Sequence, residues 1–353
     1  MVRIENPVIV GGGPGGAYCG LELARNGIAA TIIDHSYPRE KPCGGGISGS
    51  VLEKFPFVKK FSAEGGVANN IEIIFTGDNR IVVPVPRSGF NISRRILDEG
   101  ILSLALGKGA KLIKDKVTDV RFKQDACVVK TNRHIFSAKI LVGADGVNSL
   151  VRKSAIGAIH PKNLGLGFGY LGRGIESRPT TLSFLDNMPG YIWIFPRGNH
   201  SCIGIGSGLN YGSILKKLLG DFITLHCPSF RVTSRYSAMF PFADDPLFFT
   251  LPCAGKNWLL VGDAAGHADP ITGEGILYAL WSGKLAAEAI CKNMIESYDT
   301  LWREAYGNYL MDRCRKKHFF YDPVRIALWA IMNSGRGLHH KPCPDRVGTA
   351  CLF

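Results

Sequence analysis

Long hydrophobic runs are missing from this sequence: no window of about 18 or more apolar residues exists, so we expect no membrane-spanning helix. The ten cysteines include no Cys-x-x-Cys pair and follow no secretory leader, which argues against a disulfide scaffold and favours a reduced, cytoplasmic protein. Because Cys351 is third from the end, the prenylation pattern is also absent. The cysteine and histidine spacings fit no metal site, so we expect no metal.

Low-complexity tracts and nucleic-acid-binding modules are absent too, so we expect no nucleic-acid partner. What the chain has is an ordinary globular composition, 46% hydrophobic and 20% charged, over 353 residues, which is long enough for two domains. A net charge of +13 attracts polyanions of any kind, including an anionic lipid surface or a phosphorylated substrate.

A glycine-rich turn near the start organises the chain. The apolar run Val8 to Val10 predicts a buried parallel strand, and Gly11-x-Gly13-x-x-Gly16 then leads into residues with helical spacing. In such a turn the first glycine makes the bend, the second lets backbone approach a pyrophosphate, and the third lets the helix pack on the strand. A second strand ends in Asp34, whose carboxylate is expected on the adenosine ribose. Together these features predict dinucleotide binding.

Two later strands end in similar turns. Lys139 to Val142 leads into Gly143-Ala144-Asp145-Gly146, and Trp258 to Val261 leads into Gly262-Asp263-Ala264-Ala265-Gly266. Acids at these positions lie at carboxyl ends of a parallel sheet, where ligands bind in such folds.

The order of strand-like and helix-like segments along the chain predicts an α/β protein with a discontinuous Rossmann-type domain and an inserted antiparallel-sheet domain. Residues 48–60 look like an amphipathic helix, and residues 71–75 and 81–85 like a β-hairpin. The expected divisions are dinucleotide domain 1–70, 93–160 and 251–296; hairpin of the second domain 71–92; antiparallel sheet 161–250; and a C-terminal helical segment 297–353.

In this order, the three glycine motifs resemble the FAD-binding signatures of the p-hydroxybenzoate-hydroxylase-like flavoproteins. A finer match, over most of the chain, is to the geranylgeranyl reductase family. Its elements are similar to Lys41-Pro42-Cys43-Gly44-Gly45-Gly46, Arg94-x-x-Leu97-Asp98, Tyr191-x-Trp193-x-Phe195-Pro196 and Pro270-Ile271-Thr272-Gly273-Glu274-Gly275-Ile276. The Tyr-x-Trp-x-Phe-Pro element is the most discriminating, because generic flavin hydroxylases lack it.

The resemblance implies roles for individual residues. Asp263 would hold the ribityl chain, the cysteine-glycine loop would lie beside the flavin, Arg94 would reach the FAD, and the backbone of Val117 would hold the adenine. Backbone N–H groups after Gly273 would meet the N1/C2 edge of the flavin, where a helix N-terminus stabilises the negative charge of the reduced form. The expected cofactor residues are therefore Gly11, Gly13, Gly15, Gly16, Asp34, Cys43, Gly44, Gly46, Arg94, Val117, Asp145, Asp263, Gly273, Gly275 and Ile276.

Three residues are candidates for the chemistry: Cys43, Tyr191 and Trp193. Tyr191, Trp193 and Phe195 alternate along a strand, so their rings point to one face and could line an apolar slot; alternatively they fill the core of the second domain. Cys43 could be a packing residue, a thiol near the flavin, or half of a regulatory disulfide. We interpret His267 as solvated or hydrogen-bonded structure rather than a catalytic base.

The predicted function is an FAD-dependent oxidoreductase that saturates isolated double bonds of a prenyl chain carried on a lipid, diphosphate or chlorophyll-type head. Reduced flavin would supply hydride, and the proton would follow from a side chain or from water, with an acid that the sequence does not identify. The electron donor would be NAD(P)H or ferredoxin, and we expect a monomer. An oxygen-using monooxygenase or halogenase is the alternative, and a non-enzymatic flavin or lipid carrier is a weaker third hypothesis.

The end of the chain carries a further pattern. The basic residues Arg313, Arg315, Lys316 and Lys317 precede the apolar run Phe319 to Met332, an arrangement that resembles a peripheral segment at the inner face of a membrane. Pro323 predicts two short pieces rather than one helix. The alternative is that these residues pack on the substrate domain.

Overall fold

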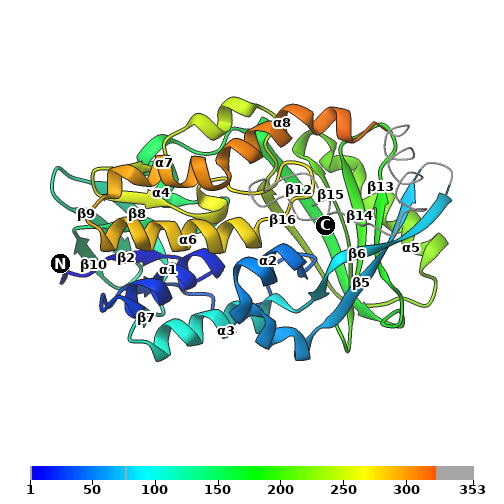
Figure 1. Ribbon diagram of the computed structural model, residues 1–353, viewed down its shortest axis with the longest axis horizontal. Coiled ribbons are helices and arrows are strands. Elements are labelled where there is room, and N and C mark those ends of the chain that lie inside the picture. Colours follow the sequence, from blue (N-terminus) through cyan, green and yellow to red (C-terminus); the bar gives the residue numbers. More distant parts are fainter. Residues whose placement is uncertain (1, 76–77, 323–353) are drawn as a thin grey trace.

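The computed structural model describes residues 2–75 and 78–322, which form two parts lying side by side (Figure 1). At the left of Figure 1 are the parallel strands and helices that surround the glycine-rich turn, and at the right is a sheet of long strands. The chain crosses between the parts repeatedly, because β5 and β6 join the second part before β7 to β11 return to the first.

The first part is built on a six-stranded sheet in the order β17-β18-β11-β2-β3-β7. Five strands are parallel, and β17 is antiparallel at one edge. Every residue of β2, β3 and β11 is buried, as expected where both faces of a parallel sheet are covered. The strands are β2 (Val8–Val10), β3 (Thr31–Ile33), β7 (Lys111–Ile113), β11 (Leu141–Gly143), β17 (Ala254–Gly255) and β18 (Trp258–Leu260).

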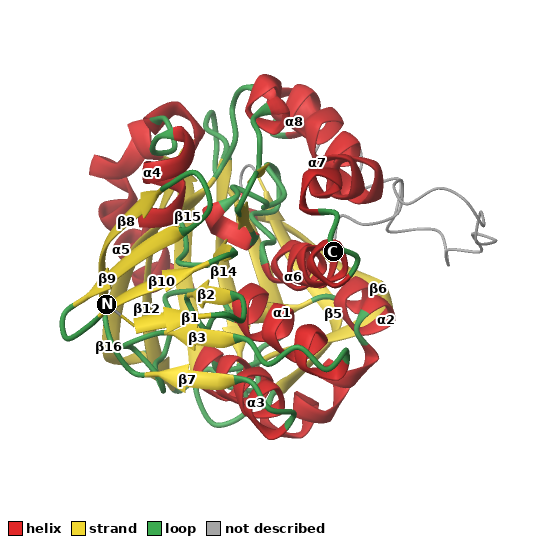
Figure 2. Cartoon of the chain, turned by 90° about the vertical axis from the view of Figure 1, so that its left-hand side faces the viewer, coloured by secondary structure: helices red, strands yellow, loops and turns green. Residues whose placement is uncertain are grey.

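Helices α1 (Pro14–Arg25), α3 (Arg94–Gly107) and α6 (Ile276–Cys291) lie together, with α1 between the other two (Figure 1). Glycines let α1 and α6 approach closely: a Cβ on Gly283 would lie 2.3 Å from the carbonyl oxygen of Gly15. Figure 2 shows these helices on one side of the strands and α4 (Leu150–Ile156) on the other.

A smaller sheet in the order β1-β10-β9-β8 shares a core with the parallel sheet, and α4 packs against β8. Its strands are β1 (Val2–Ile4), β8 (Val117–Phe122), β9 (Cys127–Thr131) and β10 (Ile135–Ala138).

The second part is an eight-stranded sheet in the order β16-β12-β15-β14-β13-β5-β6-β4, antiparallel except where β13 pairs with β5. Isoleucines of β14 and β15 form a core with Leu215 and Leu219 of α5 (Gly212–His226). The strands are β4 (Gly46–Ile47), β5 (Gly66–Phe75), β6 (Asn79–Asn91), β12 (Leu164–Arg173), β13 (Thr180–Phe184), β14 (Gly190–Pro196), β15 (Ser201–Gly208) and β16 (Arg231–Pro241). The predicted fold class is confirmed, and the predicted hairpin is present but longer than expected.

The helical stretch predicted over residues 48–60 is present, but as two helices of different type. Here α2 (Gly49–Lys54) stops at Phe55, and the 3-10 helix η1 (Pro56–Glu64) continues the chain. Pro56 explains the break, because the residue before a proline avoids the helical region, and Phe55 has φ −129° and ψ 69°. Further 3-10 turns are η3 (Pro161–Asn163), η4 (Leu209–Tyr211), η5 (Pro246–Thr250) and η6 (Gly262–Ala264).

The C-terminal segment runs along the upper edge in Figure 1, above α6. It comprises η7 (Ile295–Ser297), α7 (Tyr298–Trp302), the π-helical turn η8 (Arg303–Gly307) and α8 (Asn308–Phe320). Trp302, Tyr306 and Leu310 are buried on one face, and the predicted helical segment is present as far as Phe320.

The basic run in α8 is divided between buried and exposed positions, so its four cations do not all face solvent. Arg313 forms an ion pair with Asp269, and Lys317 is 2% exposed and donates to the carbonyl oxygens of Phe242 and Ala243. Burial lowers the pKa of Lys317 to about 8. A helix spreads consecutive residues around its axis, so cations adjacent in sequence can point in opposite directions.

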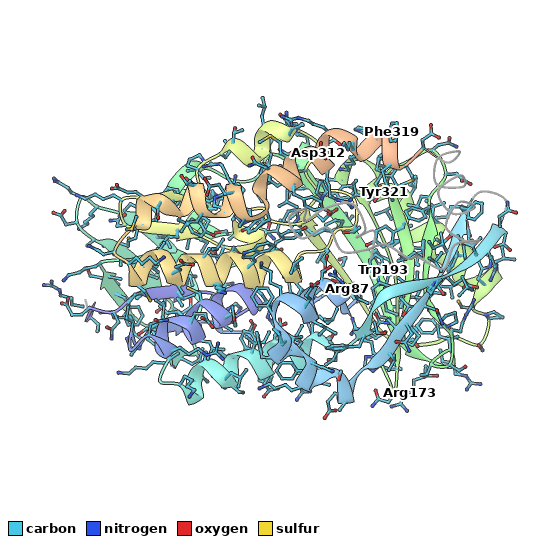
Figure 3. The ribbon with its side chains drawn as sticks, in the orientation of Figure 1. Arg87, Arg173, Trp193, Asp312, Phe319 and Tyr321 are labelled. Atoms are coloured by element: carbon cyan, nitrogen blue, oxygen red, sulfur yellow. The ribbon has the colours of Figure 1, made fainter. Side chains whose placement is uncertain are left out.

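The remaining two cations of the run, Arg315 and Lys316, are exposed. Figure 3 shows Phe319 at the outer side of α8 and Tyr321 turned towards the strands, where its hydroxyl donates to the carbonyl oxygen of Ile271. Most of the apolar run, from Pro323 to Met332, lies outside the described residues, as do Cys343 and Cys351. Among the helices described, none combines the length and apolarity needed to cross a membrane.

Candidate active site

The glycine-rich turn leaves space where a ligand's pyrophosphate would lie. Gly11 has φ +99°, and a Cβ there would lie 2.3 Å from the carbonyl oxygen of Ala144. A Cβ on Gly16 would lie 2.0 Å from the carbonyl oxygen of Gly11, so this glycine brings helix and strand together. A Cβ on Gly13 has no protein atom nearer than the Tyr37 hydroxyl at 3.9 Å. The three glycines therefore differ as predicted: two face the protein and one faces open space.

The carboxylate of Asp34 lies directly behind this turn. One oxygen accepts from the Gly12 N–H at 2.8 Å, and the other accepts from the N–H and hydroxyl of Ser36 at 2.7 and 2.6 Å. Beside it, the buried Tyr37 Oη and Arg39 Nε have no hydrogen-bond partner among the described residues. Buried polar atoms normally have partners. The open Gly13 face and these two atoms therefore fit a polar, phosphate-bearing cofactor such as FAD, and sequence patterns did not reveal Tyr37 or Arg39.

The carboxylate of Asp145, the acid of the second turn, accepts hydrogen bonds from residues that follow it closely in the chain. Its oxygens accept from the Ser149 hydroxyl and from the N–H groups of Leu150 and Val151, at the start of α4. Burial nevertheless raises the pKa of Asp145. A cofactor contact by Asp145 stays a prediction, as does the adenine contact of Val117, which is buried at the start of β8.

Asp263, the acid of the third turn, forms an ion pair with Lys41, which lies 222 residues earlier in the chain. The Lys41 Nζ to Asp263 Oδ2 distance is 2.9 Å. Burial acts to raise the pKa of Asp263, but the ammonium of Lys41, together with Arg94 and Arg39, lowers it. The acid is thus held ionised at the point where the cysteine-glycine loop meets the late glycine turn.

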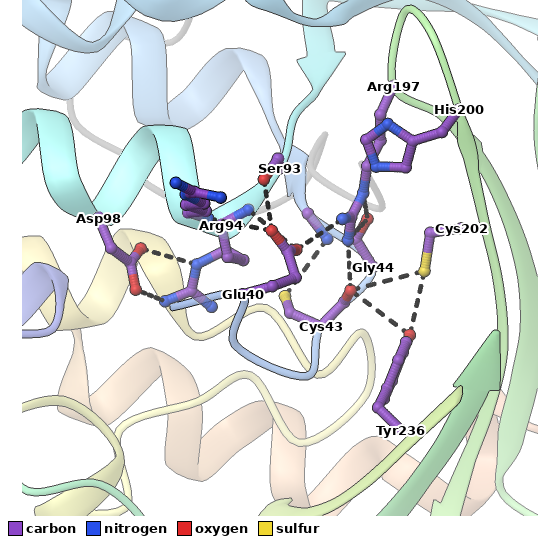
Figure 4. Close-up of polar contacts among 12 residues, drawn as sticks. Glu40, Cys43, Gly44, Ser93, Arg94, Asp98, Arg197, His200, Cys202 and Tyr236 are labelled. Atoms are coloured by element: carbon purple, nitrogen blue, oxygen red, sulfur yellow. Dashed lines mark hydrogen bonds and ion pairs between the residues drawn. The ribbon is translucent and has the colours of Figure 1, made fainter. Parts of the chain in front are cut away.

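A fully buried arginine holds the cysteine-glycine loop in place (Figure 4). Arg197 donates to the carbonyl oxygens of Cys43 at 2.5 Å and Gly44 at 2.8 and 3.0 Å, and to Glu40 at 2.7 Å. Burial acts to raise the pKa of Glu40, but Arg197 and the hydrogen bond from Ser93 lower it. Sequence reasoning missed Arg197 and Glu40, although Arg197 directly follows the Tyr-x-Trp-x-Phe-Pro element.

Arg94 lies on the other side of the same loop (Figure 4). Its guanidinium donates twice to Asp98, at 2.8 Å each, on the first turns of α3. Burial acts to lower the pKa of Arg94, but Asp98 and the nearby Cys43 thiol raise it. The Cys43 sulfur also accepts from the Gly45 N–H at 3.3 Å. The structure brings Arg94 and Cys43 together, while the FAD contact of each stays a prediction.

The predicted aromatic strand presents its rings to this loop. Tyr191, Trp193 and Phe195 are half-buried on one face of β14, whereas the alternating isoleucines face α5. A Cβ on Gly44 would lie 2.8 Å from the Phe195 ring, so this glycine permits close approach. The three rings therefore form a wall against the cysteine-glycine loop, and they also pack on a buried cluster that includes Ile73 and Leu182, so a slot lined by them stays a prediction. We call these three residues the aromatic wall.

The late glycine turn completes the arrangement. Tyr191 donates its hydroxyl to the carbonyl oxygen of Thr272, and Asp269 accepts 2.8 Å hydrogen bonds from the N–H groups of Ile271 and Thr272. The turn leads into the N-terminus of α6 at Ile276, where backbone N–H groups lack partners within the helix. Residues 270–276, the aromatic wall and the loop at Cys43 thus meet at the junction of the two parts.

His267 is hydrogen-bonded inside the protein and is not solvated, so the structure selects one of the two alternatives that we expected. It is fully buried, with its ring between the Tyr306 hydroxyl at 2.9 Å and the Cys253 sulfur at 3.7 Å. Burial lowers the pKa of His267 to about 3, so the ring is neutral at physiological pH.

Comparison with known protein sequences finds relatives that cover most of this chain. No family model matches the chain. An uncharacterized protein of Methanosarcina barkeri is 30% identical over 309 residues, covering 81% of this chain and 74% of that protein. Digeranylgeranylglycerophospholipid reductase 1 of Methanococcoides burtonii is 25% identical over 345 residues, covering 89% and 83%. Menaquinone reductase of Mycolicibacterium smegmatis is 28% identical over 330 residues, covering 84% and 78%.

The solved structures agree on the fold. A geranylgeranyl bacteriochlorophyll reductase-like protein of Thermoplasma acidophilum superposes with a TM-score of 0.84 at 23% identity, covering 95% of this chain and 92% of that one. This chain belongs to the geranylgeranyl reductase family of FAD-dependent flavoproteins. As a member of that family it is an FAD-dependent oxidoreductase, which confirms the cofactor and enzyme class expected from the motifs.

The flavin halogenases, which belong to the alternative class, have a similar fold, but one of them, a brominase, superposes less well and is less similar in sequence. The flavin-dependent brominase Bmp2 superposes with a TM-score of 0.69 at 19% identity, covering 95% of this chain and 94% of that one. A geranylgeranyl reductase family member and a flavin halogenase thus share this scaffold, and the chemistry has to be argued from the site.

Proposed function

We propose that this oxidoreductase saturates carbon–carbon double bonds of a prenyl chain carried on a polar head. The observation that carries the proposal is the aromatic wall, which faces the cysteine-glycine loop and the N-terminus of α6 at one junction. An apolar wall of this kind would hold a prenyl chain by burial alone. The similarity to digeranylgeranylglycerophospholipid reductases supports a prenylated lipid as substrate.

FAD, when bound and reduced, supplies hydride at its N5 atom. The chain's own residues would then orient the partners. Gly13 would admit the pyrophosphate, Asp263 would hold the ribityl chain, and the N-terminus of α6 would stabilise negative charge on the flavin edge. Isolated alkenes accept hydride poorly, so positioning by the aromatic wall and a proton donor have to provide the catalysis.

The electron donor is external in this proposal, and NAD(P)H and ferredoxin are the two candidates. The family's prenyl substrates are apolar, whereas the chain has a net charge of +13. The positive charge would attract both an anionic donor and an anionic lipid surface.

Anaerobic reoxidation tests the proposed function. Photoreduced enzyme is mixed with geranylgeranyl lipids, with saturated lipids as controls, or with oxygen, and flavin absorbance is followed. We expect fast reoxidation by the unsaturated lipids and slow reoxidation by oxygen. Reoxidation by oxygen alone, accelerated by a small aromatic compound or by halide, would favour the monooxygenase or halogenase instead.

The aromatic wall makes a separate prediction. Trp193→Ala should lower turnover of the prenyl substrate at least tenfold, because a half-buried ring on the slot is lost, while FAD content is kept. Trp302→Ala, a fully buried core tryptophan, serves as the benchmark and should cost about 3–5 kcal/mol of unfolding free energy. Thermal melts and turnover of both variants are compared. If Trp193→Ala loses as much unfolding free energy as Trp302→Ala, the Trp193 ring fills the core and does not line a slot.

Peripheral membrane contact is proposed on a narrower basis than the sequence suggested. Arg315 and Lys316 are exposed beside Phe319, which is 61% exposed. At about 1 kcal/mol for each cation, Arg315→Gln with Lys316→Gln should weaken binding to anionic vesicles by about 30-fold. Cosedimentation at low and high salt measures this, with Lys216→Gln and Lys217→Gln on α5 as the matched control. If both double variants lose vesicle binding equally, α8 does not contact the membrane specifically.

A further inference from the structure

The proton donor of the proposed reaction was not identifiable in the sequence, but the carboxyl groups at the junction differ in their partners. Four are ion-paired: Glu40 with Arg197, Asp98 with Arg94, Asp263 with Lys41 and Asp269 with Arg313. Glu274 is the fifth, and no Lys, Arg or His within residues 2–75 and 78–322 forms an ion pair with it. A paired carboxylate stays ionised, whereas an unpaired one near apolar groups can keep its proton.

Glu274 lies where the three pieces of the site meet. The Ser48 hydroxyl donates to its Oε1 atom at 2.6 Å, and Ser48 caps α2 just after the cysteine-glycine loop. The neighbouring Thr272 accepts from Tyr191, and a Cβ on Gly273 would lie 3.9 Å from the Tyr191 hydroxyl. The carboxyl is therefore next to the end of the aromatic wall.

The surroundings of this partly buried carboxyl raise its pKa towards neutral pH. Burial is the main effect and raises the pKa of Glu274 to about 7, while the hydrogen bond from Ser48 lowers it. Asp269 acts in the same direction as burial, and Arg313 opposes it. Two further titratable groups face it, Tyr191 from β14 and Tyr278 from α6, and the pKa of each is raised, mainly by burial.

We propose that Glu274 is the proton donor that completes saturation of the double bond. The inference rests on the proposed function and adds the missing acid to it. Hydride brings both electrons to one alkene carbon, and the Glu274 carboxyl gives its proton to form the C–H bond at the other carbon. The resulting carboxylate regains a proton from solvent before the next turnover, so one double bond consumes one hydride and one proton.

The test uses the complete FAD-loaded chain with Glu274→Gln, which keeps the shape of the side chain but holds no acidic proton. Glu288→Gln is the matched control, because Glu288 is on the same helix segment that follows the turn but pairs with Lys292 away from the junction. We expect Glu274→Gln to keep its FAD and its rate of photoreduction. Anaerobic reoxidation by a geranylgeranyl lipid should fall about 100-fold or more, as is typical for loss of a general acid.

Two pH measurements separate an acid from a structural residue. Reoxidation by wild type should fall above about pH 7, where the donor is ionised, and Glu274→Gln should lose that dependence. Ser48→Ala should move the fall to higher pH, since the lost hydrogen bond stabilises the charged form, and Ser48→Thr should restore it. Infrared titration of the oxidised enzyme should show a carboxyl that loses its proton near neutral pH in wild type and Glu288→Gln but is missing in Glu274→Gln.

Wild-type rates or an unchanged pH profile in Glu274→Gln would overturn the proposal, as would loss of FAD from that variant. If no prenyl lipid reoxidises wild type, the proposed function itself fails. The infrared titration then still decides whether Glu274 holds a proton near neutrality, and absence of its signal would overturn the inference on its own.

Discussion

Gly13→Val protein is expected to fold normally and to be colourless. Gly13 has φ −64° and ψ −180°, which valine adopts readily, and its Cβ would meet no protein atom within 3.9 Å. The branched side chain would instead occupy the space that a pyrophosphate needs. Overpacking and lost charge-assisted hydrogen bonds together should raise the Kd for FAD about a hundredfold, or about 2.8 kcal/mol.

FAD retained after gel filtration and the Kd from flavin fluorescence measure this effect. Gly220→Val is the matched control: a Cβ on Gly220, within α5, also meets nothing within 4 Å, and the residue is far from the turn. The control should keep full FAD content. If Gly13→Val binds FAD as tightly as wild type, the pyrophosphate does not approach this turn.

Arg197→Leu should be the most destabilising single change at the junction. Arg197 is 1% exposed and donates to Cys43, Gly44 and Glu40 at once, so its removal leaves two carbonyl oxygens and a carboxylate without their cation. Breaking a buried ion pair from one side costs about 3–5 kcal/mol. We expect a loss near the lower end, because the Glu40 side chain is 29% exposed.

Urea unfolding of Arg197→Leu, Glu40→Gln and the double variant gives the coupling energy of the pair. The double variant should be less destabilised than the sum of the single variants. Arg197→Lys should recover part of the stability, since an ammonium keeps the charge but not the fork that reaches both carbonyl groups. A cost below about 1 kcal/mol for Arg197→Leu, within the range of a surface substitution, would contradict the proposed clamp.

The fold could be predicted largely from local patterns. The run before Gly11, the glycine spacing and the alternation of Tyr191, Trp193 and Phe195 are each contained in a few adjacent residues. Strand burial, turn geometry and the facing of the rings follow directly from such spacings. This is why the parallel sheet and the shared face of the three rings were predicted correctly from the sequence.

What the sequence did not reveal depends on partners distant in the chain. Lys41 meets Asp263 across 222 residues and Arg197 meets Glu40 across 157, and no local pattern encodes such pairs. The same limit applies to α8, where Arg313 pairs with Asp269. Glu274 was within a recognised motif, but only the three-dimensional structure shows that no cation among the described residues forms an ion pair with it.

The composition of the product tests the central claim most directly. Reduced enzyme is given a geranylgeranyl lipid under anaerobic conditions, and the product is analysed by mass spectrometry in ordinary and in deuterated water. We predict a gain of two hydrogen atoms for each saturated double bond, and both should be deuterium in deuterated water, because the N5–H of the reduced flavin and the proton of the acid each exchange with solvent. A product that instead gains an oxygen or halogen atom, and forms only when oxygen is present, would contradict it.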